Sequence, residues 1–140
     1  MPSLRVLVVD DFEGFRRFVR SVLQRKPECQ ITEASDGMEA IQKARDSQPH
    51  LVLLDIGLPR LNGIEAAKRI RELAPLAKIV FLTQEHSPEI VREALILGAQ
   101  GYVHKPRAAS DLLRIIEAVL WDSNSLGVVP YQTRLRSCFL

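Results

Sequence analysis

Short apolar runs that alternate with segments of helical periodicity are the feature that most restricts how this chain can fold. LRVLVV, HLVLLD and KIVFLT are apolar on both faces, as expected of strands buried in the middle of a sheet. Between these runs, apolar residues recur three and four positions apart, which is typical of helices with one buried face. The alternation predicts an α/β fold in which helices cover both faces of a parallel sheet.

The pattern predicts five strands and five helices in strict alternation. Strands are expected at 4–9, 29–34, 50–55, 78–83 and 101–106, and helices after Phe12, after Gly37 and over 63–73, 88–97 and 109–121. Right-handed crossovers leave few topologies for such a chain. The second strand is the most polar, which suits a sheet edge, so we expect the flavodoxin-like, doubly wound strand order 2-1-3-4-5.

Length and composition indicate one domain. The chain has 140 residues, of which 46% are hydrophobic, and this is enough for one compact core. We expect residues 1–121 to form that domain. Residues 122–140 are too few for a second core, so they are expected to be a C-terminal extension or the remnant of a linker.

Charge and hydropathy also exclude several classes of protein. A net charge of +2 does not favour direct nucleic-acid binding through bulk electrostatics. No apolar run reaches the roughly 18 residues of a membrane span, and the N-terminus lacks the apolar stretch of a signal peptide. Cys29 and Cys138 have no metal-binding spacing and fit free thiols. These observations predict a cytoplasmic protein that does not bind membranes.

Polar side chains stand where the predicted strands end. Asp10 and Asp11 follow the first strand, Asp55 ends the third, Thr83 ends the fourth, and Lys105 follows the last apolar run. The carboxyl ends of parallel strands meet at one edge of the sheet, and ligands bind there near the topological switch point. We therefore expect these five side chains to converge at a single site.

Three neighbouring carboxylates repel each other unless a cation lies between them. Oxygen ligands with room for water favour Mg²⁺, with Mn²⁺ as the alternative, over Zn²⁺. A hard cation, the Lys105 ammonium and the Thr83 hydroxyl together suit a phosphoryl group. Carboxylates can form acyl phosphates, so on this reasoning any of the three acids is a candidate nucleophile.

Five separated motifs give the chain a family resemblance. They are VVDD (8–11), LLDIGLP (53–59) with NG (62–63), FLT (81–83) and GYVHKP (101–106). With these motifs in this order, residues 4 to about 121 resemble the receiver domain of a two-component response regulator. The resemblance implies a signalling switch that catalyses only its own phosphorylation and dephosphorylation, not a turnover enzyme.

The resemblance also implies a role for each site residue. Asp55 matches the phosphoacceptor, and Asp10 and Asp11 match the acids that bind Mg²⁺ together with Asp55. The backbone carbonyl of Gly57 matches a further metal ligand, and Lys105 matches the lysine that contacts the phosphoryl group. The implied phosphoryl donor is a histidine kinase or a histidine phosphotransfer protein.

The same resemblance predicts how the signal leaves the site. Thr83 and Tyr102 match a switch pair in which the hydroxyl approaches the phosphoryl group and the aromatic ring swings inward. The change would be read out on the face formed by the fourth helix, fifth strand and fifth helix, where a homodimer could also form. The family pattern further implies a cis Lys105–Pro106 peptide bond.

Two features of the sequence leave alternatives open. Arg16, Arg17 and Arg20, with Arg25 and Lys26, form a basic stripe that is either a solvated helix face or a docking surface for the kinase. Gln84 stands where the family usually has a small residue, which would suit a receiver-like interaction module that works without phosphorylation. An Asp-nucleophile phosphatase is less favoured, because that class separates its two acids by one residue, whereas Asp10 and Asp11 are adjacent.

Overall fold

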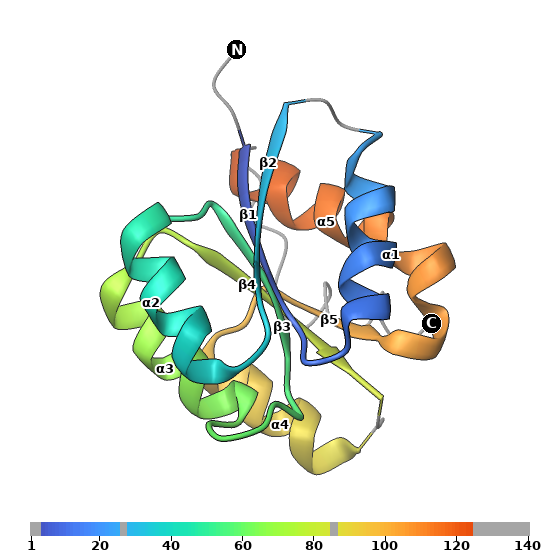
Figure 1. The fold of residues 1–140 in the computed structure, drawn as a ribbon. Helices are drawn as coiled ribbons and strands as arrows, with labels where there is room; N and C mark the ends of the chain where they lie inside the picture. The colour runs from blue at the N-terminus through green and yellow to red at the C-terminus, as the bar shows by residue number, and fades with distance from the viewer. Residues whose placement is uncertain (1–3, 26–27, 85–86, 125–140) are drawn as a thin grey trace.

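The computed structural model describes residues 4–25, 28–84 and 87–124. Its strands form one parallel sheet in the order β2-β1-β3-β4-β5 (Figure 1), which confirms the predicted flavodoxin-like topology. The strand bounds are β1 (Leu4–Val9), β2 (Cys29–Ala34), β3 (Leu51–Asp55), β4 (Lys78–Thr83) and β5 (Gly101–His104).

Helices cover both faces of this sheet, with α1 and α5 on one side and α2, α3 and α4 on the other (Figure 1). Their bounds are α1 (Glu13–Leu23), α2 (Gly37–Ser47), α3 (Gly63–Leu73), α4 (Pro88–Leu97) and α5 (Ala108–Asn124). No helix in the described part of the chain is long and apolar enough to cross a membrane. Residues 125–140, most of the predicted extension, lie outside the described residues.

The buried pattern of each strand follows its place in the sheet. All residues of β3 are buried, and only the first residues of β1 and β4 are partly exposed, as expected of strands covered on both faces. The edge strand β2 is mostly half-buried. Val9 lies in register with Ala34 on one side and Leu54 on the other, so β1 and β3 end at the same level.

Polar caps determine where two helices begin. The side chain of Asp36 accepts a hydrogen bond from the Glu39 amide at 2.8 Å, and that of Asn62 accepts one from the Glu65 amide at 2.9 Å. Gly63 then lets α3 start against the end of β3, because a Cβ there would lie 2.2 Å from the backbone oxygen of Asp55. Local sequence therefore sets the geometry of the loop that follows Asp55.

The last predicted strand is shorter than expected. β5 ends at His104, and Lys105–Arg107 form a 3₁₀ turn, η1, that leads directly into α5. The prediction of a cis Lys105–Pro106 bond is wrong, since the described residues contain no cis peptide bond. Pro106 stands in the first turn of η1, where its missing amide hydrogen is not needed and a trans bond is accommodated.

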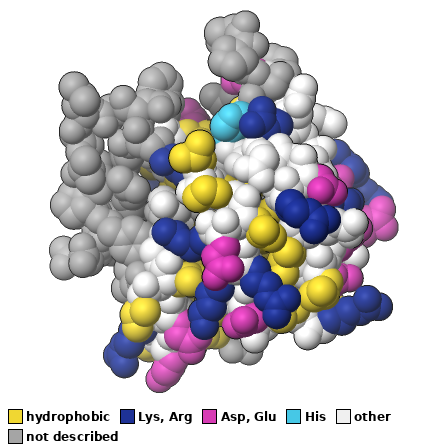
Figure 2. Space-filling view, turned by 90° about the vertical axis from the view of Figure 1, so that its left-hand side faces the viewer, with side chains coloured by type: hydrophobic (Ala, Val, Ile, Leu, Met, Phe, Trp, Pro, Cys, Tyr) yellow, Lys and Arg dark blue, Asp and Glu magenta, His cyan; other side chains and the backbone are white. Residues whose placement is uncertain are grey.

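The outer face of α2 and α3 carries charged side chains of both signs (Figure 2), interspersed with small hydrophobic patches. Several of these charges form exposed ion pairs within a helix, including Lys43 with Glu39 and Lys68 with Glu65. Such pairs contribute little to stability. This face is therefore typical of a solvated helix surface.

Candidate functional site

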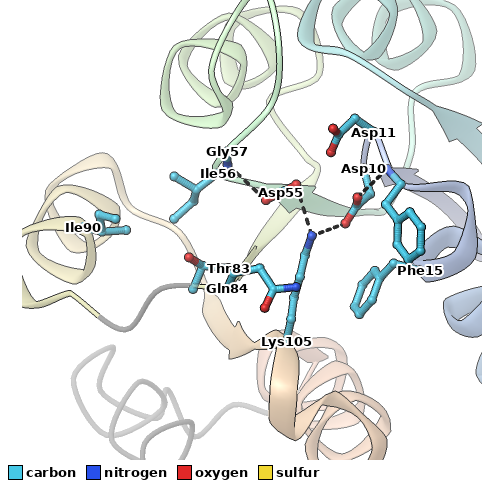
Figure 3. Close-up of a pocket in the computed structure, with 11 residues that line it drawn as sticks. Asp10, Asp11, Phe15, Asp55, Ile56, Gly57, Thr83, Gln84, Ile90 and Lys105 are labelled. Carbon is cyan, nitrogen blue, oxygen red and sulfur yellow. Dashed lines mark hydrogen bonds and ion pairs between the residues drawn. The ribbon is translucent and has the colours of Figure 1, made fainter.

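An acidic cluster lies where β1 and β3 end, close to the predicted switch point (Figure 3). Asp10 and Asp11 follow β1 and Asp55 ends β3, and one carboxylate oxygen from each lies within 4.8 Å of the others. Asp10 and Asp55 are buried, whereas Asp11 is exposed. The parallel register of the two strands thus brings together three acids that are far apart in the sequence.

Lys105 enters the cluster from the opposite side, at the start of η1. Its ammonium donates a hydrogen bond to Asp55 Oδ2 at 3.1 Å and forms an ion pair with Asp10 Oδ2. The ammonium also lies 4.8 Å from the centre of the Phe15 ring, within cation–π range. One cation is therefore shared by two buried carboxylates.

The two carboxylate oxygens of Asp10 have different partners. Its Oδ1 accepts a hydrogen bond from the Phe12 amide at 2.9 Å. Oδ2 is buried, and its partner is the Lys105 ammonium, with which it forms an ion pair. Burial raises the pKa of Asp10, although Lys105 and the Phe12 amide act in the opposite direction and Asp55 adds to the rise. The buried Asp10 carboxylate therefore depends on a neighbouring cation for its charge balance.

Asp55 is held by the turn that follows it. Its Oδ1 accepts a hydrogen bond from the Gly57 amide at 3.0 Å, and its Oδ2 receives the bond from Lys105. The amide of Ile56 continues the pairing of the sheet by donating to the Leu82 carbonyl. The carboxylate is thus fixed by backbone and side-chain donors at the end of the most buried strand.

These residues line a cavity of about 510 Å³. Its walls are Asp10, Asp11, Phe12, Phe15, Asp55, Ile56, Gly57, Thr83, Gln84, Ile90 and Lys105. The structure therefore brings together six of the seven predicted site residues. Tyr102 does not line the cavity: it is fully buried on β5, in register with Phe81, so its ring already lies in the interior.

Four apolar side chains around the cavity were not predicted as site residues. Phe12, Phe15, Ile56 and Ile90 line the cavity together with the polar groups, and Phe12, next to Asp11 in the chain, is 67% exposed. The helical period indicated only that Phe15 faces inward, and that signal does not distinguish packing from a site wall. Only its adjacency to Asp11 could have identified Phe12 from the sequence.

The family model of the response regulator receiver domain matches residues 6–117 of the chain, a span that includes all seven predicted site residues. This chain belongs to that family. Receiver domains bind Mg²⁺ at an acidic pocket and interact with histidine kinases or phosphotransfer proteins. The Asp10, Asp11 and Asp55 carboxylates of this receiver offer the oxygen ligands that Mg²⁺ prefers.

Relatives of this receiver are found in proteins of different lengths. It is 34% identical over 115 residues to the chemotaxis protein CheY of Thermotoga maritima, and the match covers 82% of this chain and 93% of that protein. It is 33% identical over 117 residues to the transcriptional regulatory protein LnrK of Bacillus subtilis, and the match covers 83% of this chain. The receiver spans 53% of LnrK, about half of that longer relative.

Solved structures share the fold at comparable identity. CheY4 of Vibrio cholerae superposes with a TM-score of 0.76 at 32% identity, covering 84% of this chain and 98% of that one. A CheY of Borrelia burgdorferi, solved in a complex with CheX, BeF₃ and Mg²⁺, gives a TM-score of 0.78 at 25% identity and covers 85% and 90% of the two chains. The receiver fold is thus common to all of these proteins.

Proposed function

We propose that this receiver is a phosphoacceptor switch of a two-component system, in which Asp55 takes a phosphoryl group from a histidine kinase or a phosphotransfer protein. The observation that carries the proposal is the convergence of three carboxylates and the Lys105 ammonium in one open cavity. A phosphoryl group requires a site in which cations neutralise its oxygens. Here a metal ion would do so on one side and the Lys105 ammonium on the other.

Asp55 is the best nucleophile of the three acids. Asp10 is 0% exposed and Asp11 is exposed, whereas Asp55 is 6% exposed, lines the cavity and contacts the Lys105 ammonium (Figure 3). In the transfer, an Asp55 oxygen forms the new bond to phosphorus while the bond from phosphorus to the histidine nitrogen breaks. The electron pair of that bond stays on the histidine nitrogen, and a proton on the other ring nitrogen of the phosphohistidine lets the ring leave as neutral imidazole.

The acidic side of the cavity would hold Mg²⁺. Asp10, Asp11 and Asp55 are oxygen ligands, and the Gly57 backbone carbonyl would complete the protein's share of the coordination shell. When bound, the metal would neutralise the negative charge that the phosphoryl oxygens bring to this site. Without Mg²⁺, the protein itself holds the acids together, and Lys105 is the counter-ion of Asp10 and Asp55.

Lys105, Thr83 and Tyr102 would convert phosphorylation into a change of shape. Lys105 already contacts Asp55, so its ammonium can form an ion pair with a phosphoryl oxygen on that residue. The buried Thr83 lines the cavity, where its hydroxyl can donate a hydrogen bond to the phosphoryl group. Movement of Thr83 would alter the packing of the buried Tyr102 ring and shift an equilibrium between two states of the α4–β5–α5 face. This face is also where we propose that a homodimer forms.

Gln84 supports a second candidate function. Its side chain is exposed and lines the cavity, and its backbone oxygen lies 3.0 Å from His104 Nε2. A long side chain at the cavity could narrow the path of the phosphoryl donor. A receiver that is closed in this way would act as an interaction module without phosphorylation.

Acetyl phosphate distinguishes the two functions. The intact mass of the protein is measured after incubation with this small donor, with and without Mg²⁺. We expect a gain of one phosphoryl group that requires the metal and is lost in Asp55→Asn. Asp111→Asn is the matched control, because Asp111 is also a buried carboxylate but lies on α5 and pairs with Arg107 and Arg114.

Either of two results would contradict the switch. Labelling that persists in Asp55→Asn would assign the nucleophile to another residue. No labelling of the wild type, under conditions that label a CheY protein, would favour the interaction module.

A further inference from the structure

Arg16 does not lie where the helical period of α1 places it. The spacing assigned it to the outer face with Arg17 and Arg20, yet its side chain is only 16% exposed, compared with 67% for Arg17. The guanidinium turns toward β1 and β2. Its Nη1 donates a hydrogen bond to the backbone oxygen of Asp10 at 2.6 Å, and its Nε donates to Glu33 Oε1 at 3.0 Å. Interpreting the whole stripe as a solvated helix face is therefore wrong for Arg16.

Glu33 holds the guanidinium in this position. It lies on β2 in register with Val8, two residues before Asp10, and its second carboxylate oxygen pairs with Arg20. Its backbone oxygen accepts a hydrogen bond from Lys43 Nζ at 2.6 Å, which ties this part of β2 to α2. Both carboxylate oxygens of Glu33 thus have a cationic partner, so the side chain that orients Arg16 is itself fixed.

The hydrogen bond from Arg16 acts on the peptide that joins Asp10 and Asp11. Before this peptide, the Asp10 amide donates to the Ala34 carbonyl at 3.1 Å and continues the pairing of β1 with β2. After it, the Phe12 amide bonds to the Asp10 side chain and starts the turn into α1. Between these two contacts, the carbonyl of Asp10 accepts the hydrogen bond from Arg16.

We propose that Arg16 is a positioning residue for the cation site. It holds the Asp10–Asp11 peptide so that both carboxylates point toward Asp55, and Glu33 keeps its guanidinium in place. The inference rests on the proposed binding of Mg²⁺ by Asp10, Asp11 and Asp55. Groups that orient metal ligands without touching the metal typically change metal affinity by about 10- to 100-fold when they are removed.

Charge and geometry make opposite predictions for Arg16. If its positive charge acted only through the field, its removal would reduce the repulsion felt by Mg²⁺ and would strengthen binding. If it positions the two acids, its removal lets the peptide rotate and weakens binding. The sign of the change in Mg²⁺ affinity therefore separates the two effects.

The experiment is a calorimetric titration of the full chain with Mg²⁺ alone. We expect Arg16→Met to weaken Mg²⁺ binding by about tenfold. Arg17→Met is the matched control, because it removes the same charge from the same helix at an exposed position, where Arg17 pairs with the equally exposed Glu13. We expect its affinity to stay within about twofold of the wild type, since exposed charges are screened.

A second variant separates positioning from a general loss of stability. Arg16→Lys keeps a donor that can reach the Asp10 oxygen, so we expect it to recover most of the Mg²⁺ affinity even if it unfolds at a lower denaturant concentration. A parallel readout is the Mg²⁺ concentration that gives half-maximal labelling by acetyl phosphate. We expect this concentration to rise in Arg16→Met, while the labelling rate at saturating Mg²⁺ stays close to that of the wild type.

The outcomes distinguish this inference from the proposed function. A wild type that binds no Mg²⁺ would overturn the metal site itself. A wild type that binds Mg²⁺ with an Arg16→Met variant of equal or higher affinity would overturn only the positioning role. If Arg16→Met does not fold, equal Mg²⁺ affinities of the folded Arg16→Lys variant and the wild type support the carbonyl contact, and a tenfold loss in Arg16→Lys contradicts it.

Discussion

Charged groups have opposite roles at the two ends of the parallel strands, which we call the amino edge, where the strands begin, and the carboxyl edge, where they end. At the amino edge, the Arg5 guanidinium donates hydrogen bonds to the backbone oxygens of Ser47 and Gln48, where α2 ends. Gln48 in turn donates to the Leu73 oxygen near the end of α3 at 3.0 Å. A cation that binds helix-terminal carbonyls is stabilising because it satisfies orphan acceptors and opposes the negative end of the helix dipole.

The carboxyl edge lacks this balance. Asp10 and Asp55 there share the ammonium of Lys105, and one oxygen of the Asp11 carboxylate lies within 4.8 Å of an oxygen of each of these two acids. The amino edge thus stabilises the fold as it stands, whereas the carboxyl edge carries repulsion that a bound cation can relieve. Local departures from good pairing of this kind are expected at functional sites.

The largest expected effect at the carboxyl edge comes from Asp10→Asn. The substitution removes a metal ligand, so Mg²⁺ affinity should fall at least tenfold in a calorimetric titration. It also removes a buried charge, so the metal-free protein should become more stable to urea by about 1 kcal/mol. Asp111→Asn is the control, and it should lose stability because Arg107 and Arg114 lose their partner. An Asp10→Asn protein that is less stable than the wild type would contradict the claim that the carboxyl edge carries unrelieved repulsion.

Arg5→Met tests the opposite edge. Hydrogen bonds from a charged donor to the end of α2 are lost, so the free energy of unfolding in urea should decrease by about 2 kcal/mol. Mg²⁺ affinity should not change, because β1 separates this edge from the acids. A parallel loss of Mg²⁺ affinity would show that the amino and carboxyl edges are coupled and do not act independently.

Gln84→Ala should have a smaller effect, confined to the carboxyl edge. The shorter side chain opens the cavity, so labelling by acetyl phosphate and the later loss of the label should both become a few-fold faster. The time course of intact mass measures both rates. Unchanged rates would show that Gln84 does not limit access to Asp55.

The smallest expected effect is a pH dependence at the amino edge. Burial and the neighbouring Arg5 lower the pKa of His50, whose Nδ1 accepts a hydrogen bond from the Arg5 amide at 2.9 Å. Because the folded-state pKa lies below the ordinary value of about 6.5, the contribution of His50 to stability is present above that pH and is lost as the pH falls toward the folded-state pKa.

Urea unfolding at pH 7.5 and at pH 5.5 measures this contribution. The wild type should lose more stability than His50→Asn over this interval, and equal losses would contradict the assignment. The effect should be modest because His50 is exposed.

The strand order and most of the site could be predicted because they depend on periodicity along the chain. Fully apolar runs identify the central strands, and the acids that end them must meet at one edge once the strands are parallel. Asp10, Asp55 and Lys105 therefore lie together as expected. The caps Asp36 and Asn62 are equally local signals, since each bonds to an amide three residues later.

Periodicity could not identify the residues whose role depends on a neighbouring element. Arg16 turns inward because Glu33 of β2 and the Asp10 carbonyl lie beside it, and a helical wheel carries no information about either. Phe15 likewise lies under the Lys105 ammonium only because η1 places that lysine over α1. A family pattern also failed at Pro106, where the local 3₁₀ turn accommodates a trans bond.

The sequence by itself determined the alternation of strands and helices, the order of the sheet and the edge at which its acids meet. These follow from short-range regularities: apolar periodicity, caps and the handedness of crossovers. Only the tertiary structure decided which charges neutralise one another, because an ion pair depends on distances between elements that are remote along the chain. The pairing of Lys105 with Asp10 and Asp55, and of Arg16 with Glu33, belongs to this second class.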